Sequence, residues 1–108
     1  MSQHQICLCT CPDEATAQNL ATSLVEEKLA ACVNILPKVL SVYSWQGTIQ
    51  QDQECLLLIK SNKQTFAAIQ EHILARHPYE LPEIIAVPIE DGLKPYLQWI
   101  DDVMEFKQ

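Results

Sequence analysis

The sequence predicts an α+β fold in which the elements follow the order β-α-β-β-α-β and one extra helix closes the chain. Two amphipathic stretches with helical spacing separate segments that are rich in strand-forming residues. A lone glycine, Gly47, divides a long extended region. Two split β-α-β units with right-handed crossovers would form a four-stranded antiparallel sheet with both helices on one face. The 108 residues are expected to form a single domain, residues 1–108.

Residues 5–10 predict a short strand, and a helix is expected to follow it directly. Pro12 suits the first helical position, and Asp13 and Glu14 would then lie in the first turn, where acidic side chains are favourable. Lys28 is expected in the last turn, where a cation complements the helix dipole. Apolar residues recur at helical spacing between these ends: Ala17, Leu20, Ala21, Leu24, Val25 and Leu29.

The next part of the chain predicts a long β-hairpin. Residues 30–45 are rich in β-branched and aromatic side chains, although Pro37 interrupts the run. Gln46-Gly47 marks a turn before a second strand, residues 48–60. Residues 56–59 are apolar on both faces, which predicts a central strand that is covered on both sides. Other subunits, with a contribution from the C-terminal helix, are the expected cover for the face that the two main helices leave open.

The remaining elements follow from capping and proline signals. Ser61 and Gln64 fit a capping box that opens a second helix, which is expected to close near Arg76. Residues 77–82 contain two prolines and cannot continue that helix, and residues 84–87 predict a short buried strand. The final helix is expected to open at a proline, with apolar positions at helical spacing: Pro95, then Leu93, Leu97, Ile100 and Met104.

Charge and hydropathy exclude several classes of partner. The chain carries 7 basic and 14 acidic side chains, a formal net charge of −7, and an acidic surface repels phosphate backbones. Nucleic acid is therefore not an expected partner. A membrane is not expected either, because no apolar run approaches the roughly 20 residues that span a bilayer. The first residues lack the features of a signal peptide, so a cytoplasmic location is expected.

Five cysteines bear on the chemistry. Cys7, Cys9 and Cys11 alternate along the first strand, whereas Cys32 and Cys55 stand alone. An odd number at these spacings makes a poor disulfide framework, and the spacing differs from the paired C-x2-C of structural zinc sites. The three alternating cysteines would share one face of the strand. From the residues alone, packing on a buried face is the favoured interpretation of each.

Several segments together resemble the CutA family, the divalent-cation tolerance proteins. The most specific is His77-Pro78-Tyr79-Glu80-Leu81-Pro82-Glu83, and the others are residues 10–21, 27–35, 41–47 with Glu54, and 96–99. The resemblance implies a ferredoxin-like fold and a tightly packed homotrimer. It also implies a connection with tolerance of copper and other divalent metals, and a cytoplasmic location as in the bacterial members.

The resemblance also implies a metal site. The family's site uses a cysteine of the first strand and two successive histidines before Pro-Tyr. The cysteine falls on Cys9 and the second histidine on His77, whereas the first falls on Arg76, which stays protonated and cannot coordinate. Water, Glu80, Glu83 or a neighbouring subunit would complete the ligand set. Thiolate suits Cu(I), and imidazole suits both copper states and zinc, so copper, or otherwise zinc, is the expected metal.

Three functions compete on this basis. The favoured one is a non-catalytic homotrimer that binds metal ions. The alternative is a trimeric sensor or scaffold, like the PII signalling trimers that CutA trimers resemble, with a small molecule or protein in the intersubunit clefts. An enzyme with Cys9 as nucleophile and His77 as base lacks an evident orienting residue and oxyanion motif, so no catalytic residue is expected. Aromatic residues with polar tips could line such clefts or an interface: Tyr43, Trp45, Tyr79 and Trp99.

The homotrimer carries two further expectations. Association stabilises only the folded state, so high thermal stability is expected. A charge at Leu57 or Ile59 is expected to prevent assembly, because an unpaired buried charge is costly.

Overall fold

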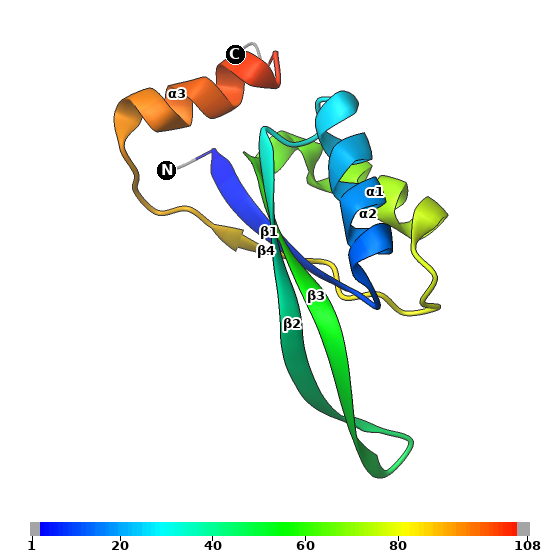
Figure 1. Ribbon diagram of the computed structural model, residues 1–108. Coiled ribbons are helices and arrows are strands. Elements are labelled where there is room, and N and C mark those ends of the chain that lie inside the picture. Colours follow the sequence, from blue (N-terminus) through cyan, green and yellow to red (C-terminus); the bar gives the residue numbers. More distant parts are fainter. Residues whose placement is uncertain (1–2, 106–108) are drawn as a thin grey trace.

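A four-stranded antiparallel sheet in the order β2-β3-β1-β4 organises the chain (Figure 1). The computed structural model describes residues 3–105. The strands are β1 (His4–Cys11), β2 (Cys32–Trp45), β3 (Thr48–Asn62) and β4 (Ile85–Pro88). Their order and directions are those of two split β-α-β units. The predicted α+β, ferredoxin-like fold is thereby confirmed.

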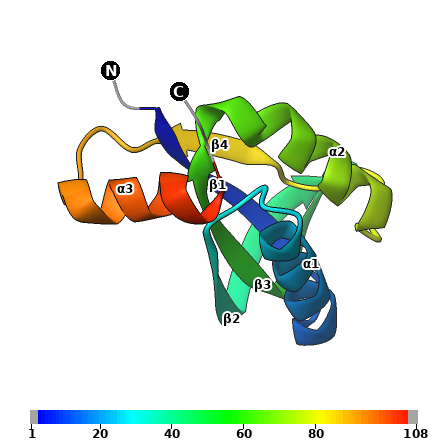
Figure 2. The ribbon, with the colours of Figure 1, turned by 90° about the horizontal axis from the view of Figure 1, so that it is seen from above.

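Two helices, α1 (Glu14–Glu26) and α2 (Phe66–Arg76), cover one face of the sheet (Figures 1 and 2). Burial along β1 alternates strictly, and Cys7, Cys9 and Cys11 share the side that faces these helices, as predicted. A 3₁₀ turn, η1 (Lys63–Thr65), leads into α2. The buried core between helices and sheet comprises Cys7, Cys9, Cys11, Ala17, Leu20, Leu24, Ala30, Cys55, Leu57, Ile59, Ile69 and Ile73.

The third helix, α3 (Lys94–Val103), lies across the sheet from α1 and α2 (Figure 2). It packs near the start of β1, where His4 Nε2 lies 3.1 Å from Asp101 Oδ1. Lys60 Nζ lies over the Tyr96 ring, 5.8 Å from its centroid. The helix therefore covers part of the face that the other two helices leave open, as expected. Among the helices described between residues 3 and 105, none has both the length and the hydropathy needed to cross a membrane.

The β2–β3 hairpin projects beyond the helical layer and gives the molecule its length of 46 Å (Figure 1). Its turn is formed by Gln46 and Gly47, whose φ angles of 50° and 80° match the two-residue turn that suits the twist of paired strands. Pro37 does not end β2, because a bulge between Leu36 and Val39 accommodates the missing N–H on this edge strand.

The start and the end of α1 differ from prediction. Asp13 is the N-cap, not a first-turn residue, and its carboxylate accepts a hydrogen bond from the Thr16 N–H at 2.7 Å. A capping carboxylate satisfies a free N–H, which Pro12 at that position could not do. Lys28 lies beyond the helix with a φ of 60° and pairs with Glu105, so its charge stabilises a contact with the end of the chain.

The start of the second helical segment also differs. Asn62 caps η1 by accepting a hydrogen bond from the Gln64 N–H at 3.2 Å. The predicted cap, Ser61, remains in β3, where it is buried and its Oγ accepts a hydrogen bond from Gln5 Nε2. Both residues are good caps, and the pairing of β1 with β3 up to Asn62 decides between them.

The sheet presents a second apolar face that α1 and α2 do not cover. Its central residues are half-buried: Ile6, Leu8, Leu56 and Leu58. In β4, Ile85 and Val87 lie on the same face and are 51% and 47% exposed. The prediction that residues 84–87 form a buried strand is therefore wrong for the single chain, because the strand lies exposed at the sheet edge.

The side chains of Leu57 and Ile59 point to the helices and are fully buried there. A charge at either position would therefore act on the fold itself. The expectation that Leu57 and Ile59 are the positions at which a charge would act on assembly is wrong. The residues of β3 that face outward are Leu56 and Leu58.

Leu57→Glu is expected to lower the free energy of unfolding by more than about 3 kcal/mol, because it buries a charge in a packed core. Gln70→Glu adds the same charge at an exposed position of α2 and should change stability by less than about 0.5 kcal/mol. Urea denaturation at one fixed protein concentration measures both changes. Equal stability of the two variants would contradict the assignment of Leu57 to the core.

His72 is expected to make stability depend on pH. It is buried beside Ser23, and burial together with the positive charge of Arg76 lowers its pKa, against a smaller opposite effect of Glu27. The unfolded chain then binds a proton more readily than the folded chain, so stability should fall as pH drops below about 6.5. His72→Gln should flatten this fall in urea denaturation at pH 7.5 to 5.5, and an unchanged slope would refute the assignment.

Candidate metal centre

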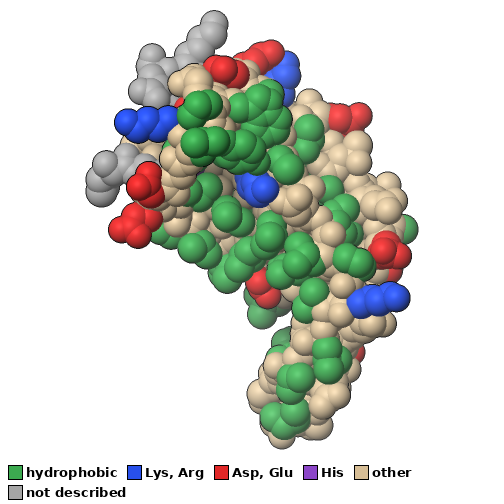
Figure 3. Space-filling view, turned by 60° about the vertical axis from the view of Figure 1, so that its left-hand side comes forward, with side chains coloured by type: hydrophobic (Ala, Val, Ile, Leu, Met, Phe, Trp, Pro, Cys, Tyr) green, Lys and Arg blue, Asp and Glu red, His purple; other side chains and the backbone are tan. Residues whose placement is uncertain are grey.

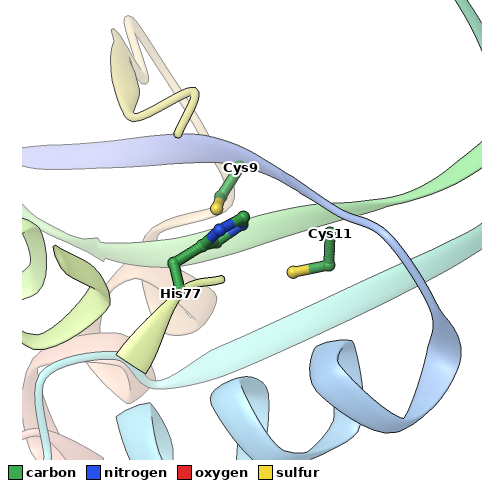
Figure 4. A group of neighbouring side chains, drawn as sticks. All are labelled: Cys9, Cys11 and His77. Carbon is green, nitrogen blue, oxygen red and sulfur yellow. The ribbon is translucent and has the colours of Figure 1, made fainter. Parts of the chain in front are cut away.

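Three sulfur- and nitrogen-bearing side chains meet on the helix-facing side of the sheet (Figure 4). Cys9 and Cys11 come from the end of β1, and His77 is the residue that follows α2. One potential ligand atom from each lies within 4.8 Å of the others, and all three residues are buried. The structure thus brings together Cys9 and His77, the two residues that the sequence singled out, although they are far apart in the chain.

Cys11 is the member of the group that the sequence does not identify as a candidate ligand. It was interpreted as a packing residue, as was Cys7, which does pack in the core outside the group. The signal that could have identified Cys11 is the Cys-x-Cys spacing, because residues two apart in a strand project from the same face.

Local geometry explains how His77 reaches the strand. Its N–H donates to the Ile73 carbonyl at 2.8 Å, which closes α2, and its own backbone is already extended, with ψ at 138°. Pro78 enforces this change, because a residue before proline is driven out of the helical region. The chain therefore turns at His77, and the imidazole points to Cys9 and Cys11 (Figure 4).

Two hydrogen bonds define the protonation of the imidazole. The Tyr79 N–H can only donate, and it lies 3.1 Å from His77 Nδ1. The Thr10 carbonyl can only accept, and it lies 2.7 Å from Nε2. The proton therefore resides on Nε2, and the ring is neutral. Coordination by Nε2 would require this proton to move to Nδ1, with loss of the hydrogen bonds to the Thr10 carbonyl and from the Tyr79 N–H.

Cys9 and Cys11 affect each other's pKa. The hydrogen bond between them raises the pKa of Cys9, with further increases from burial and from the nearby carboxylates of Glu83 and Glu54. The same bond lowers the pKa of Cys11 against the opposing effect of burial. Cys11 is therefore the more readily ionised of the two thiols, and the Cys9 thiol lies 3.8 Å from the Thr10 carbonyl, to which it donates.

The charged side chains that the structure describes near Cys9, Cys11 and His77 do not belong to the group of close ligand atoms. Glu80 and Glu83 are exposed, and neither belongs to the group of close ligand atoms. Arg76 is also exposed, and its guanidinium donates to the His72 carbonyl at 3.0 Å. Glu54 is buried but accepts a hydrogen bond from the Tyr79 hydroxyl at 2.8 Å.

The donor set fits a thiophilic metal ion. Cysteine thiolates and neutral imidazole are the ligands of zinc and copper sites in proteins. Such ions bind sulfur and nitrogen at about 2.0–2.3 Å, so donors spread over 4.8 Å would have to draw inward by about 1 Å. Rotation of the His77 side chain away from Thr10 is the movement that this requires.

Comparisons with known proteins agree with this fold. Residues 5–103 match the family model described as CutA1 divalent ion tolerance protein. The divalent-cation tolerance protein CutA of Thermus thermophilus is 48% identical over 96 residues, which cover 89% of this chain and 93% of that protein. The CutA homolog of Xenopus laevis is 45% identical over 95 residues, covering 88% of this chain but 63% of that protein, so the chain spans less than two thirds of this longer relative.

A solved structure gives the same result. The periplasmic divalent cation tolerance protein CutA of Archaeoglobus fulgidus superposes with a TM-score of 0.91 at 40% identity, covering 94% of this chain and 98% of the other. The family match over residues 5–103 spans the candidate centre and the described sheet apart from His4. The chain therefore belongs to the CutA1 family of divalent-ion tolerance proteins.

Proposed function

We propose that this divalent-ion tolerance protein acts by binding metal ions, copper first and zinc second, at a centre that includes Cys9 and His77. The observation that carries the proposal is the approach of these two side chains, 68 positions apart in the sequence, to within 4.8 Å in a buried site. The names of the relatives, which describe divalent-cation tolerance, support the same class of ligand.

The proposed role is binding without catalysis. A nucleophilic cysteine needs a base that can take its proton. Nε2 of His77 already carries a proton and donates it to Thr10, and Nδ1 accepts from the Tyr79 N–H, so neither nitrogen is free to act on Cys9. A cytoplasmic location goes with this proposal, because reducing conditions would keep the thiols available.

The proposed assembly is a homotrimer. Its support is the apolar face of the sheet between α3 and the hairpin, where apolar side chains gather on the surface (Figure 3). On this face β4 contributes Ile85 and Val87, which are 51% and 47% exposed, beside the half-buried Leu56 and Leu58 of β3. The hairpin adds exposed apolar side chains on its other face, where Leu40 and Ile49 are 63% and 69% exposed. A soluble chain rarely leaves apolar surface of this kind uncovered, and other copies of the chain would bury it.

Cys9→Ser and His77→Ala are each expected to weaken copper and zinc binding by about 100-fold or more, because each removes a ligand. Isothermal titration of the reduced protein with Cu(I), Cu(II) and Zn(II) measures the change. Cys32→Ser is the matched control, since this half-exposed cysteine lies outside the group, and it should bind as the wild type does. Wild-type protein that binds none of these ions would instead favour the trimeric sensor or scaffold.

Leu58→Glu is expected to convert the trimer to monomers, because it places a charge in the middle of the open face without entering the core. Sedimentation equilibrium should give three times 12.3 kDa for the wild type and for the exposed control Gln70→Glu, and 12.3 kDa for Leu58→Glu. The wild type should also melt above the range of about 45–65 °C that is typical of mesophilic domains. A monomeric wild type would refute the assembly.

A further inference from the structure

We propose that Cys11 is the third ligand of this centre, and that its two thiolates and one imidazole make the site selective for a closed-shell thiophilic ion, Cu(I) or Zn(II), over Cu(II). The inference rests on the proposed metal-binding function and specifies its ligand set and its metal class. It assigns a chemical role to a residue that would otherwise be part of the packed core.

The placement of Cys11 equals that of Cys9. Both side chains are fully buried, both project from the same face of β1, and both lie within 4.8 Å of the His77 imidazole through one ligand atom each (Figure 4). Both sulfur atoms come from β1, where Cys9 pairs with Leu57 and Cys11 with Cys55 of β3, so the backbone pairing holds their spacing. When an ion enters, His77 gives up its hydrogen bond to the Thr10 carbonyl and the three donors draw together.

Cys11 supplies the donor that Arg76 cannot. The guanidinium of Arg76 is exposed, bonded to a backbone carbonyl of its own helix, and permanently charged. A third ligand therefore has to come from elsewhere, and Cys11 is the residue that the described structure places beside the other two. The site thus has a sulfur donor from β1 in place of a nitrogen donor at the end of α2.

Two sulfur donors change which ions the site prefers. Thiolates favour Cu(I) and zinc, whereas Cu(II) favours tetragonal arrangements of nitrogen and oxygen. Cys9 and Cys11 are closed to solvent, and among the described residues no carboxylate belongs to the group. The buried carboxylate of Glu54 already accepts a hydrogen bond from the Tyr79 hydroxyl. A three-donor, sulfur-rich pocket is therefore poorly suited to Cu(II).

Charge distinguishes the two remaining ions. Two thiolates with Zn(II) give a neutral centre, whereas two thiolates with Cu(I) leave one negative charge in a buried place near Glu54. Three-fold coordination suits Cu(I), and zinc would need a fourth ligand such as water. The same thiolate and imidazole donors would bind both ions, so separate titrations with Cu(I) and Zn(II) tell them apart.

The test compares three cysteine variants of the full-length reduced protein. Affinity for Cu(I) and Zn(II) is measured by competition with chromophoric chelators, and Cu(II) by direct titration. Cys11→Ala should weaken Cu(I) or Zn(II) binding by about 100-fold, as Cys9→Ala does. Cys55→Ala is the matched control, because Cys55 is buried opposite Cys11 on β3 but lies outside the group. Its affinity should equal that of the wild type.

X-ray absorption of the loaded wild type gives a readout that needs no variant. Two sulfur and one nitrogen scatterers per metal ion are expected, and a single sulfur would overturn the inference. Unchanged affinity of Cys11→Ala beside a loss in Cys9→Ala would overturn it too, while leaving the proposed metal binding intact. Absence of binding by the wild type would overturn both, and tighter binding of Cu(II) than of Cu(I) and Zn(II) would overturn the selectivity.

Discussion

The two-residue alternation of side chains along β1 and β3 is the constraint on which the rest of the structure depends. The middle of each strand, residues 6–9 of β1 and 55–59 of β3, is apolar on both faces, but α1 and α2 cover one face only. Every odd-numbered residue from Cys7 to Cys11 is therefore enclosed with the helices, and every even-numbered neighbour is turned to the open face. One register thus creates a closed thiol-lined site on one side and an apolar surface for assembly on the other.

Most of the fold could be predicted because its signals are local. Helical and strand periodicities, the glycine of the hairpin turn and the prolines after α2 each act within a few residues. The errors occur where neighbouring residues offer the same local signal. Asp13 and Asn62 are the caps, and not their neighbours, because the pairing of strands and the paths of turns decide between equivalent candidates. The burial of β4 was misjudged because its apolar composition does not say whether the cover comes from the same chain.

The site was predictable only in part. The family resemblance identified Cys9 and His77, and the structure places them together, but the spacing of cysteines in one strand is equally typical of packing. What separates Cys11 from Cys7 is the position of the loop after α2, which is a tertiary property. The alternating pattern of β1 is the same at both ends of the strand. It therefore cannot predict that an imidazole approaches the Cys11 end and that Cys7 packs in the core.

The partners within the sheet differ greatly in their distance along the chain, and this has a consequence for how the protein folds. Trp45 pairs with Thr48 across a two-residue turn, whereas His4 pairs with Asn62 and Gln5 with Pro88. Closing a longer loop costs more chain entropy, so the β2–β3 hairpin can form before β1 pairs with β3. A centre assembled from β1 and the segment after α2 then exists only in a chain that has completed its longest closures, and a newly made polypeptide would acquire its affinity for metal as a last step of maturation.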